Sequence, residues 1–278
     1  MKICISEVTT LPASFADDVA AFKAAGVAGM EVWLTKLEKH LENHSAEETR
    51  MLIADSGLAL PAAAYQGGLL LSQGVERRTH FDDFRKRLDL CQFFGIETLL
   101  VVADFERAVD ETSLRRAVVS LTEAARWAVG NGVKLALEFR GAATFCASLD
   151  TAINLVAACG EPNVGVCLDL FHFYKGPSKF EDLDRLSAAN LAHVQICDVA
   201  GTPRELMTDA DRILPGDGDL QIGPFLETLG AINYAGWVSL ELMNPTLWHS
   251  DSRQVVEMGA AAMQRAAKMT NAPPITNE

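Results

Sequence analysis

The stretch NVGVCLDLFHFYKG, residues 163–176, has the pattern of a buried β-strand that ends in charge. Apolar residues alternate with small residues from Val164 to Leu168, and Asp169 comes directly after them. His172 follows three positions later, among aromatic residues. A carboxylate at the end of a buried strand is strongly destabilising unless a partner offsets its charge. The stretch therefore predicts a buried strand and a specific partner for Asp169.

Short apolar runs of this kind recur along the chain, separated by longer segments with the 3.6-residue periodicity of helices, such as residues 15–26 and 113–132. The predicted strands are residues 2–6, 29–34, 58–65, 98–103, 133–139, 164–170, 191–197 and 237–242. Alternation of strands with helices indicates a parallel sheet, because parallel strands need crossover connections. Eight such units close most simply into a (β/α)₈ barrel. An open doubly wound sheet is the alternative, but the Gly-rich turn that it predicts after the first strand is absent from SEVTTLPAS.

We therefore predict an α/β fold, a single-domain (β/α)₈ TIM barrel, over residues 1–270, with a flexible C-terminal tail at 271–278. A chain of 278 residues with 49% hydrophobic residues is long and apolar enough for such a barrel. The connection from Asp198 to about Asp219 is longer than a typical barrel loop, which suggests a lid.

The formal net charge of −13 argues against nucleic acid and against an anionic membrane surface as partners, since both are bound chiefly through Lys and Arg. The six cysteines show no CxxC or zinc-ribbon spacing, which indicates buried thiols in a reducing compartment. The N-terminal stretch MKICISEVTTLP lacks the apolar segment of a signal peptide, and no apolar run is long enough to cross a bilayer. We expect a cytoplasmic protein.

Four consecutive predicted strands each end in an oxygen-bearing side chain, namely Glu138, Asp169, Gln195 and Glu241. In a barrel these strand ends meet at the functional face, where three carboxylates would repel one another. A divalent cation is the simplest compensation, and an oxygen-rich ligand set favours Mn²⁺ or Mg²⁺ over Zn²⁺ or Co²⁺. Pairing of each acid with a local Arg or Lys is the alternative.

Several further side chains lie near the predicted strand ends, where they could hold a substrate. His172 follows the sixth strand, and Arg212 lies in the long connection within TDADRILPGDGDL. Packing or a surface ion pair is the competing interpretation for each of them. The candidate substrate-binding residues are His172, Arg212, Arg140, Trp33, Trp248 and His249.

The segments LALEFRG, NVGVCLDLFHFYKGPS, HVQICD, TDADRILPGDGDL and GWVSLELMNP carry a family resemblance that covers essentially the whole chain. The chain resembles the xylose isomerase-like, sugar phosphate isomerase/epimerase superfamily, and within it the inosose isomerases. The resemblance implies metal ligands at Glu138, Asp169, Gln195 and Glu241, and substrate contacts at His172 and Arg212. Gln195 departs from the family, most members of which carry His there. Bacterial 3-dehydroshikimate dehydratases of the same fold are similar to this chain at that position.

The chemistry shared by that superfamily is removal of a proton next to a carbonyl, with a divalent cation stabilising the enediolate. We predict a metal-dependent isomerase or epimerase of an unphosphorylated keto-sugar or inosose, with Glu138 and Glu241 as the acid and base. Two alternatives stay open: a lyase, either 3-dehydroshikimate dehydratase-like or eliminating a 3-keto-glycoside, and a non-catalytic sugar-binding barrel. The expected partner is a small keto-sugar or cyclitol. Association with further copies or with a partner subunit is left open.

Overall fold

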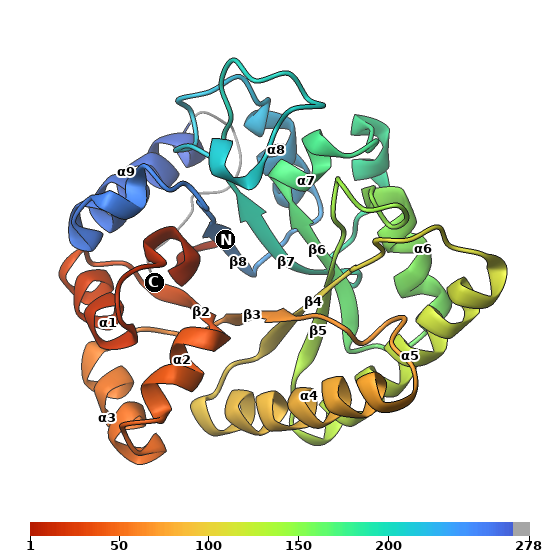
Figure 1. The fold of residues 1–278 in the computed structure, drawn as a ribbon. Coiled ribbons are helices and arrows are strands. Elements are labelled where there is room, and N and C mark those ends of the chain that lie inside the picture. Colours follow the sequence, from red (N-terminus) through yellow and green to blue (C-terminus); the bar gives the residue numbers. More distant parts are fainter. Residues whose placement is uncertain (269–278) are drawn as a thin grey trace. The chain divides into compact units, whose positions relative to one another are not determined.

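The eight strands follow one another in sequence order in a closed parallel barrel, with helices alternating along the chain (Figure 1). The structure is a computed structural model, and it describes residues 1–268. The predicted (β/α)₈ fold is confirmed. The predicted tail at 271–278 lies outside the described residues, and the domain boundary stays a prediction.

The strands agree closely with the apolar runs of the sequence. They are β1 (Lys2–Ser6), β2 (Gly29–Trp33), β3 (Ala62–Gln66), β4 (Thr98–Val102), β5 (Lys134–Glu138), β6 (Val164–Asp169), β7 (Leu191–Ile196) and β8 (Trp237–Leu240). The α-helices are α1 (Phe15–Ala24), α2 (Leu34–Leu41), α3 (Ala46–Ser56), α4 (Gly74–Phe94), α5 (Glu111–Gly130), α6 (Leu149–Cys159), α7 (Leu170–Lys175), α8 (Ile222–Ala231) and α9 (Ser252–Lys268). Short 3₁₀ helices are η1 (Glu7–Thr10), η2 (Phe180–Arg185), η3 (Asp209–Asp211) and η4 (Leu247–His249). Of the described helices, none is long and apolar enough to cross a membrane.

One strand begins later than the sequence pattern predicts. The prediction placed it at 58–65, whereas β3 runs from Ala62 to Gln66, and before it Ala59 makes only an isolated bridge with Gly29. Pro61 explains the difference, because it has no backbone N–H to donate and it restricts the residue before it.

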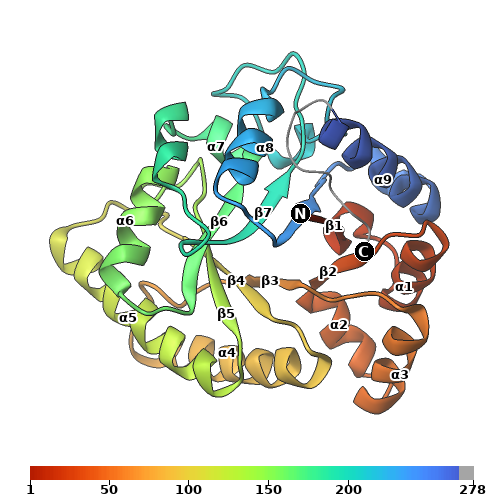
Figure 2. The ribbon, with the colours of Figure 1, turned by 180° about the vertical axis from the view of Figure 1, so that it is seen from behind.

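The chain packs as two compact units. Of the described residues, the first unit holds Met1–Pro61 and Gln195–Lys268, and the second holds Ala62–Val194. In the first unit β1 pairs with both β2 and β8, and α9 packs on β1 (Figure 2). The core of this unit is apolar: Ile5 and Leu240 are fully buried, and Gly259 of α9 leaves room for the Leu240 side chain.

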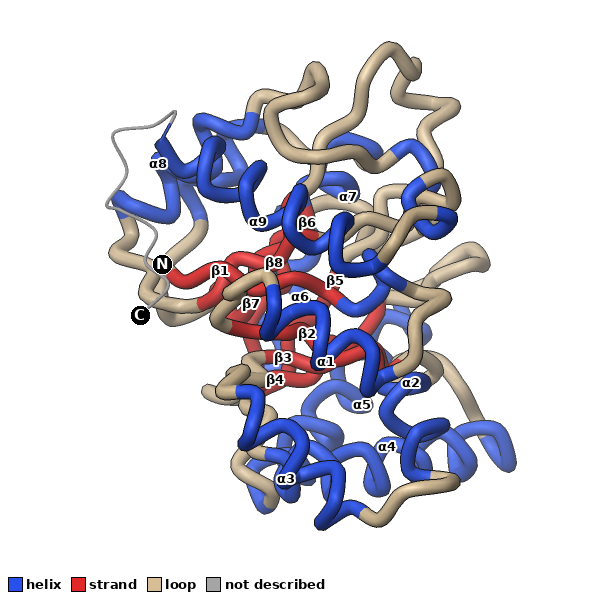
Figure 3. Tube along the Cα trace, turned by 90° about the vertical axis from the view of Figure 1, so that its left-hand side faces the viewer, coloured by secondary structure: helices blue, strands red, loops and turns tan. Residues whose placement is uncertain are grey.

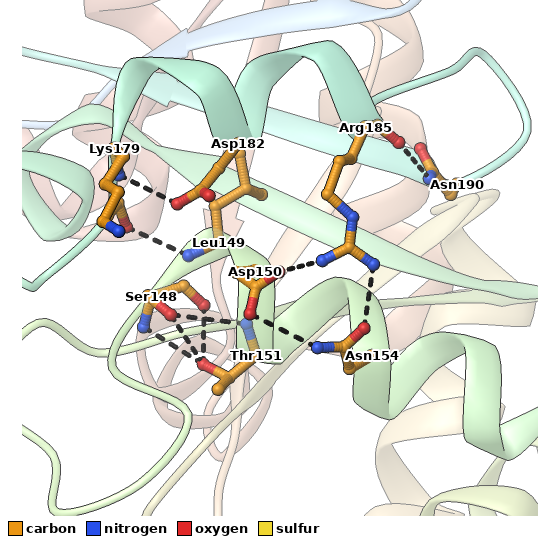
Figure 4. Close-up of polar contacts among 10 residues, drawn as sticks. Ser148, Leu149, Asp150, Thr151, Asn154, Lys179, Asp182, Arg185 and Asn190 are labelled. Atoms are coloured by element: carbon orange, nitrogen blue, oxygen red, sulfur yellow. Dashed lines mark hydrogen bonds and ion pairs between the residues drawn. The ribbon is translucent and has the colours of Figure 1, made fainter.

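In the second unit β3, β4, β5 and β6 pair in order, and the pairing aligns Glu138 of β5 with Cys167 of β6. Helices, drawn blue in Figure 3, contact these strands. At the start of α6 a capping box joins Ser148 and Thr151, and Arg185 of η2 binds Asp150 and Asn154 (Figure 4). These contacts fix the start of α6 and join it to η2.

The cysteines are buried free thiols, as the sequence predicted. Burial raises the pKa of Cys91 and that of Cys146 to about 12. Burial also raises the pKa of Cys4, and the nearby negative charge of Glu31 adds to the shift. These three thiols therefore stay protonated, and neither metal binding nor nucleophilic chemistry is expected of them.

A buried cluster of ionisable groups, Glu7, Asp18 and Lys36, lies in the first unit, where β1 and β2 end. Glu7 and Asp18 are fully buried, and the Lys36 ammonium forms an ion pair with Asp18. Glu7 Oε2 accepts the backbone N–H of Trp33 at 2.8 Å. Glu7 Oε1 and Asp18 Oδ1 accept no hydrogen bond from the described residues, so each carboxyl group is incompletely solvated by the protein. Burial raises the pKa of Glu7 well above its ordinary value, and the charge of Asp18 raises it further.

The Glu7→Gln variant should be more stable than the parent protein, by a margin that grows with pH. Glu7 has a raised pKa in the folded state, so above about pH 4.3 the folded state binds a proton that the unfolded state has lost. Stability therefore falls as the pH rises through this window, and an amide, which mimics the protonated acid, removes the fall. Urea unfolding between pH 5 and pH 8 measures the effect. Glu227→Gln, an exposed change, is the control, and a constant difference across this range would contradict the raised pKa of Glu7.

Candidate functional site

The second unit brings three sequence-predicted residues together at the ends of β5 and β6. Glu138 is the last residue of β5 and Asp169 the last of β6, and His172 lies in the first turn of α7. Asp169 is fully buried, Glu138 is 8% exposed and His172 is 6% exposed. The distance from His172 Nε2 to Glu138 Oε1 is 3.5 Å. These three side chains form the β5–β6 cluster.

The local sequence explains why the strand turns into a helix at this place. Asp169 has extended backbone angles and is the N-cap of α7, where its Oδ1 accepts the backbone N–H of His172 at 2.9 Å. Asp is among the preferred N-cap residues, because its side chain satisfies an amide that the first helical turn leaves without a partner. The partner sought for Asp169 is thus in part the backbone of the LFHFYK helix, and the same bond fixes the carboxylate beside His172.

The β5–β6 cluster has the donor set of a divalent-metal site. Glu138, Asp169 and His172 each offer a ligand atom, and these atoms lie within 4.8 Å of one another. Carboxylate oxygens suit Mn²⁺, Mg²⁺ and Zn²⁺, whereas an imidazole nitrogen suits Zn²⁺ and other transition metals. The sequence predicted the two carboxylates as ligands and His172 as a substrate contact, and its position beside Glu138 is compatible with either role.

The first unit brings together the other two predicted ligands, Gln195 and Glu241. Gln195 is fully buried on β7, and its Nε2 donates to Glu241 Oε1 at 2.9 Å and to Glu31 Oε1 at 3.0 Å. Two carboxylates around one amide nitrogen require this amide orientation, since the opposite one would place an acceptor against acceptors. The amide nitrogen is a donor only, so a cation bound at residue 195 would be bound through Oε1.

Arg212 places a buried guanidinium beside Glu241 in the first unit. It is only 1% exposed, and its Nη1 lies 3.0 Å from Glu241 Oε2. Its Nη2 and Nε contact Asp209 Oδ1 at 3.0 and 3.2 Å. The long connection that carries Arg212 therefore places a guanidinium against Glu241, whereas its role as a lid stays a prediction. Glu241, 5% exposed, accepts hydrogen bonds from both Gln195 and Arg212.

Glu31 was not among the sequence-predicted site residues. It lies in the middle of β2, is fully buried and accepts from Gln195. The available signal was its position in GMEVW, where an acid interrupts an otherwise apolar strand. A charge at such a position needs a specific partner.

The remaining substrate-binding candidates have more varied surroundings. Arg140 is half-buried and lines a cavity of about 280 Å³ with Asp104, Phe105 and Glu106. Trp33 is half-buried, and its backbone N–H is held by Glu7. The indole N–H of Trp248 donates to the Val8 carbonyl at 3.0 Å, and His249 is exposed. Substrate contact stays a prediction for all four candidates, Arg140, Trp33, Trp248 and His249.

Arg212→Ala should lower the free energy of unfolding by about 3–5 kcal/mol, since removal of one partner leaves the buried Glu241 carboxylate without its ion pair. Urea denaturation at neutral pH measures the loss. Arg253→Ala breaks an exposed Arg–Glu pair on α9 and should leave the stability almost unchanged. Equal effects of the two substitutions would show that the Arg212–Glu241 pair carries no special stability.

Comparison with known proteins agrees with this fold over nearly the whole chain. An inosose isomerase of Halalkalibacterium halodurans is 26% identical over 92% of this chain and 93% of its own. A 3-dehydroshikimate dehydratase of Pseudomonas putida is 26% identical over 88% of this chain but 38% of its own. The crystal structure of IolI protein with a bound zinc atom superposes with a TM-score of 0.91 at 24% identity, covering 97% of this chain and 99% of that one.

A second solved structure, D-psicose 3-epimerase in the presence of D-fructose, has a TM-score of 0.78 at 20% identity, covering 96% of this chain and 99% of that one. The sequence profile of one family matches residues 19–267. The chain belongs to the xylose isomerase-like TIM barrel family.

Proposed function

We propose that the chain is a metal-dependent isomerase or epimerase that moves a proton next to the carbonyl of an unphosphorylated keto-sugar or inosose. One observation carries the proposal. Glu138 and Glu241 are carboxylates less than a tenth exposed at the ends of β5 and β8, and each lies beside a nitrogen donor, His172 or Arg212. A pair of acids with slight solvent access is what proton removal and return require.

The relatives support this reaction class. Inosose isomerases from several Bacillaceae match at 26–27% identity over 92% of the chain, and D-psicose 3-epimerases share the fold. Ketose epimerisation and inosose isomerisation both begin with loss of a proton alpha to a ketone. An unphosphorylated substrate is favoured because Asp209 and Glu241 already balance the charge of Arg212, so this guanidinium offers a phosphate no net positive charge.

In this proposal Glu138, Asp169, Gln195 and Glu241 are the ligands of one Mn²⁺ or Mg²⁺ ion, as their positions at consecutive strand ends predict. When bound, such a cation withdraws charge from the substrate oxygens and so makes the neighbouring C–H more acidic. The imidazole of His172 and the zinc in the IolI structure make Zn²⁺ the alternative ion.

The chain's own residues move the proton. One of Glu138 and Glu241 takes the proton from the carbon next to the ketone, and the other returns a proton. Return to the former carbonyl carbon gives isomerisation, in which the proton of the neighbouring hydroxyl passes to the former carbonyl oxygen. Return to the same carbon from the opposite face gives epimerisation. Arg212 and His172 hold substrate hydroxyls, and their burial excludes bulk water from the exchanging proton.

A dehydratase of 3-dehydroshikimate or a similar keto compound is the second candidate. Gln195 favours it, because the dehydratases resemble this chain at that position, and two Pseudomonas enzymes of this name match at 25–26% identity. The first step is the same proton removal, after which the hydroxyl beta to the carbonyl leaves as water. Arg140, which lines a cavity in the second unit, could bind the carboxylate of such a substrate.

The Mn²⁺-loaded protein in D₂O should exchange a carbon-bound proton of one compound from a panel of inososes, ketohexoses and 3-dehydroshikimate. Glu241→Gln should slow that exchange about 10²–10⁴-fold, because it removes a general acid or base. Proton NMR measures the rate and identifies isomer, epimer or dehydrated product. Glu257→Gln on the exposed face of α9 is the control. Metal binding without exchange of any compound would favour a non-catalytic sugar-binding barrel.

Gln195→His should raise the Zn²⁺-over-Mn²⁺ affinity ratio by at least about tenfold, because an imidazole ligand prefers zinc whereas an amide oxygen does not. Competitive titration of the purified protein with chelator-buffered metals measures the ratio without any substrate. Gln254→His, on an exposed position of α9, should leave the ratio unchanged. An unaltered ratio in Gln195→His would remove residue 195 from the proposed ligand set.

A further inference from the structure

Asp198 is a buried carboxylate that accepts hydrogen bonds from four backbone amides. It follows β7 by two residues and is 1% exposed. Its Oδ1 accepts the N–H groups of Val199 and Leu220, both at 2.9 Å. Its Oδ2 accepts those of Gly216 at 2.9 Å and Gly218 at 3.0 Å. Hydrogen bonds to an ionised acceptor are about twice as strong as neutral ones, so this is a firm attachment point.

The four donors come from both ends of one segment, the β7–α8 connection, residues 197–221. The start of the connection is therefore tied to its end, and two backbone bonds between Asp198 and Ile213, at 2.8 and 2.9 Å, tie in its middle. A further bond, Asp219 N–H to Val199 C=O at 2.8 Å, closes the segment beside them.

The PGDG motif at 215–218 supplies the backbone that Asp198 needs. Gly216 has φ +90°, a conformation that glycine adopts without strain, and a side chain at 218 would collide with the Asp198 carboxylate. The alternate N–H groups of Gly216, Gly218 and Leu220 converge on the carboxylate, so this stretch of backbone binds an anion. Here the anion is a side chain of the same unit.

Arg212 depends on this attachment because it precedes Ile213, which Asp198 holds by its backbone. The carbonyl of Arg212 accepts the side-chain amide of Asn244 at 2.9 Å, and its guanidinium contacts Glu241. Both ends of Arg212 are thus fixed: its backbone carbonyl by Asn244 and its guanidinium by Glu241. The two backbone bonds of Ile213 to Asp198 tie this residue to the start of the connection, so the carboxylate that fixes Asp198 also supports the chain beside Arg212.

We propose that Asp198 is a positioning residue for the reaction: its carboxylate fixes the β7–α8 connection so that Arg212 lies against Glu241. This inference rests on the proposed function, in which Glu241 is an acid or base, but the attachment itself does not. Asp198 touches neither substrate nor reacting atoms in this proposal. A carboxylate is required because an amide offers one acceptor oxygen, and its NH₂ group would face two N–H donors.

Asp198→Asn is the test, with Asp219→Asn as the matched control. Asp219 lies in the same connection but is exposed and accepts one backbone N–H, from Gly201. Two readouts need no substrate: hydrogen exchange of the amides at 214–220, and labelling of Arg212 by phenylglyoxal, detected by mass spectrometry. In Asp198→Asn we expect at least tenfold faster exchange and labelling, with neither change in Asp219→Asn. Unchanged exchange and labelling in Asp198→Asn would overturn the inference.

The effect on catalysis is tested with a double-mutant cycle of Asp198→Asn and Arg212→Ala. The quantity measured is kcat/KM for the compound that exchanges a proton in D₂O. Asp198→Asn should lower kcat/KM at least tenfold in the parent protein, but less than threefold when Arg212 is already Ala, because both changes remove the same interaction. Equal losses in both backgrounds would overturn the positioning role.

If no compound exchanges a carbon-bound proton in D₂O, the proposed function fails. The attachment of the connection is then decided by amide hydrogen exchange and phenylglyoxal labelling alone. If Asp198→Asn does not fold, Gly218→Ala takes its place, since it displaces the carboxylate without removing its charge.

Discussion

The need to satisfy buried carboxylates with donors governs the described structure from the strand ends outward. Asp169 is held by the first turn of α7, Glu241 by Gln195 and Arg212, and Asp198 by four backbone amides. An unpaired acid at any of these positions would cost several kcal/mol. The loops therefore adopt the conformations that bring donors to the acids.

Much of the fold was readable from the sequence, because parallel strands that are buried on both faces appear as uninterrupted apolar runs. All eight strands were placed correctly except at the start of β3, where Pro61 divides an apolar run that looks continuous. A run of apolar residues indicates burial. Pairing in a sheet also requires backbone N–H donors, and proline has none.

The acidic residues of the candidate site could be predicted from the sequence, but their hydrogen-bond partners could not. Glu138, Asp169 and Glu241 are recognisable because each closes an apolar run. Glu31 was missed because it interrupts its strand instead of ending it, and its partner Gln195 is 164 positions away along the chain. The role of Asp198 was also missed, since its four donors are backbone amides, which leave no side-chain signature beyond the two glycines of PGDG.

The attachment of the β7–α8 connection by backbone amides has an evolutionary consequence. Because Asp198 binds main-chain groups, its four bonds require no particular side chain between Ala200 and Thr208, whereas Asp209 is kept as a partner of Arg212. That stretch can accumulate substitutions at little cost to stability while Gly216 and Gly218 stay fixed. A barrel built this way can diversify the surface beside Arg212 and still fold, so randomised libraries at these positions are a rational starting point for changing its selectivity.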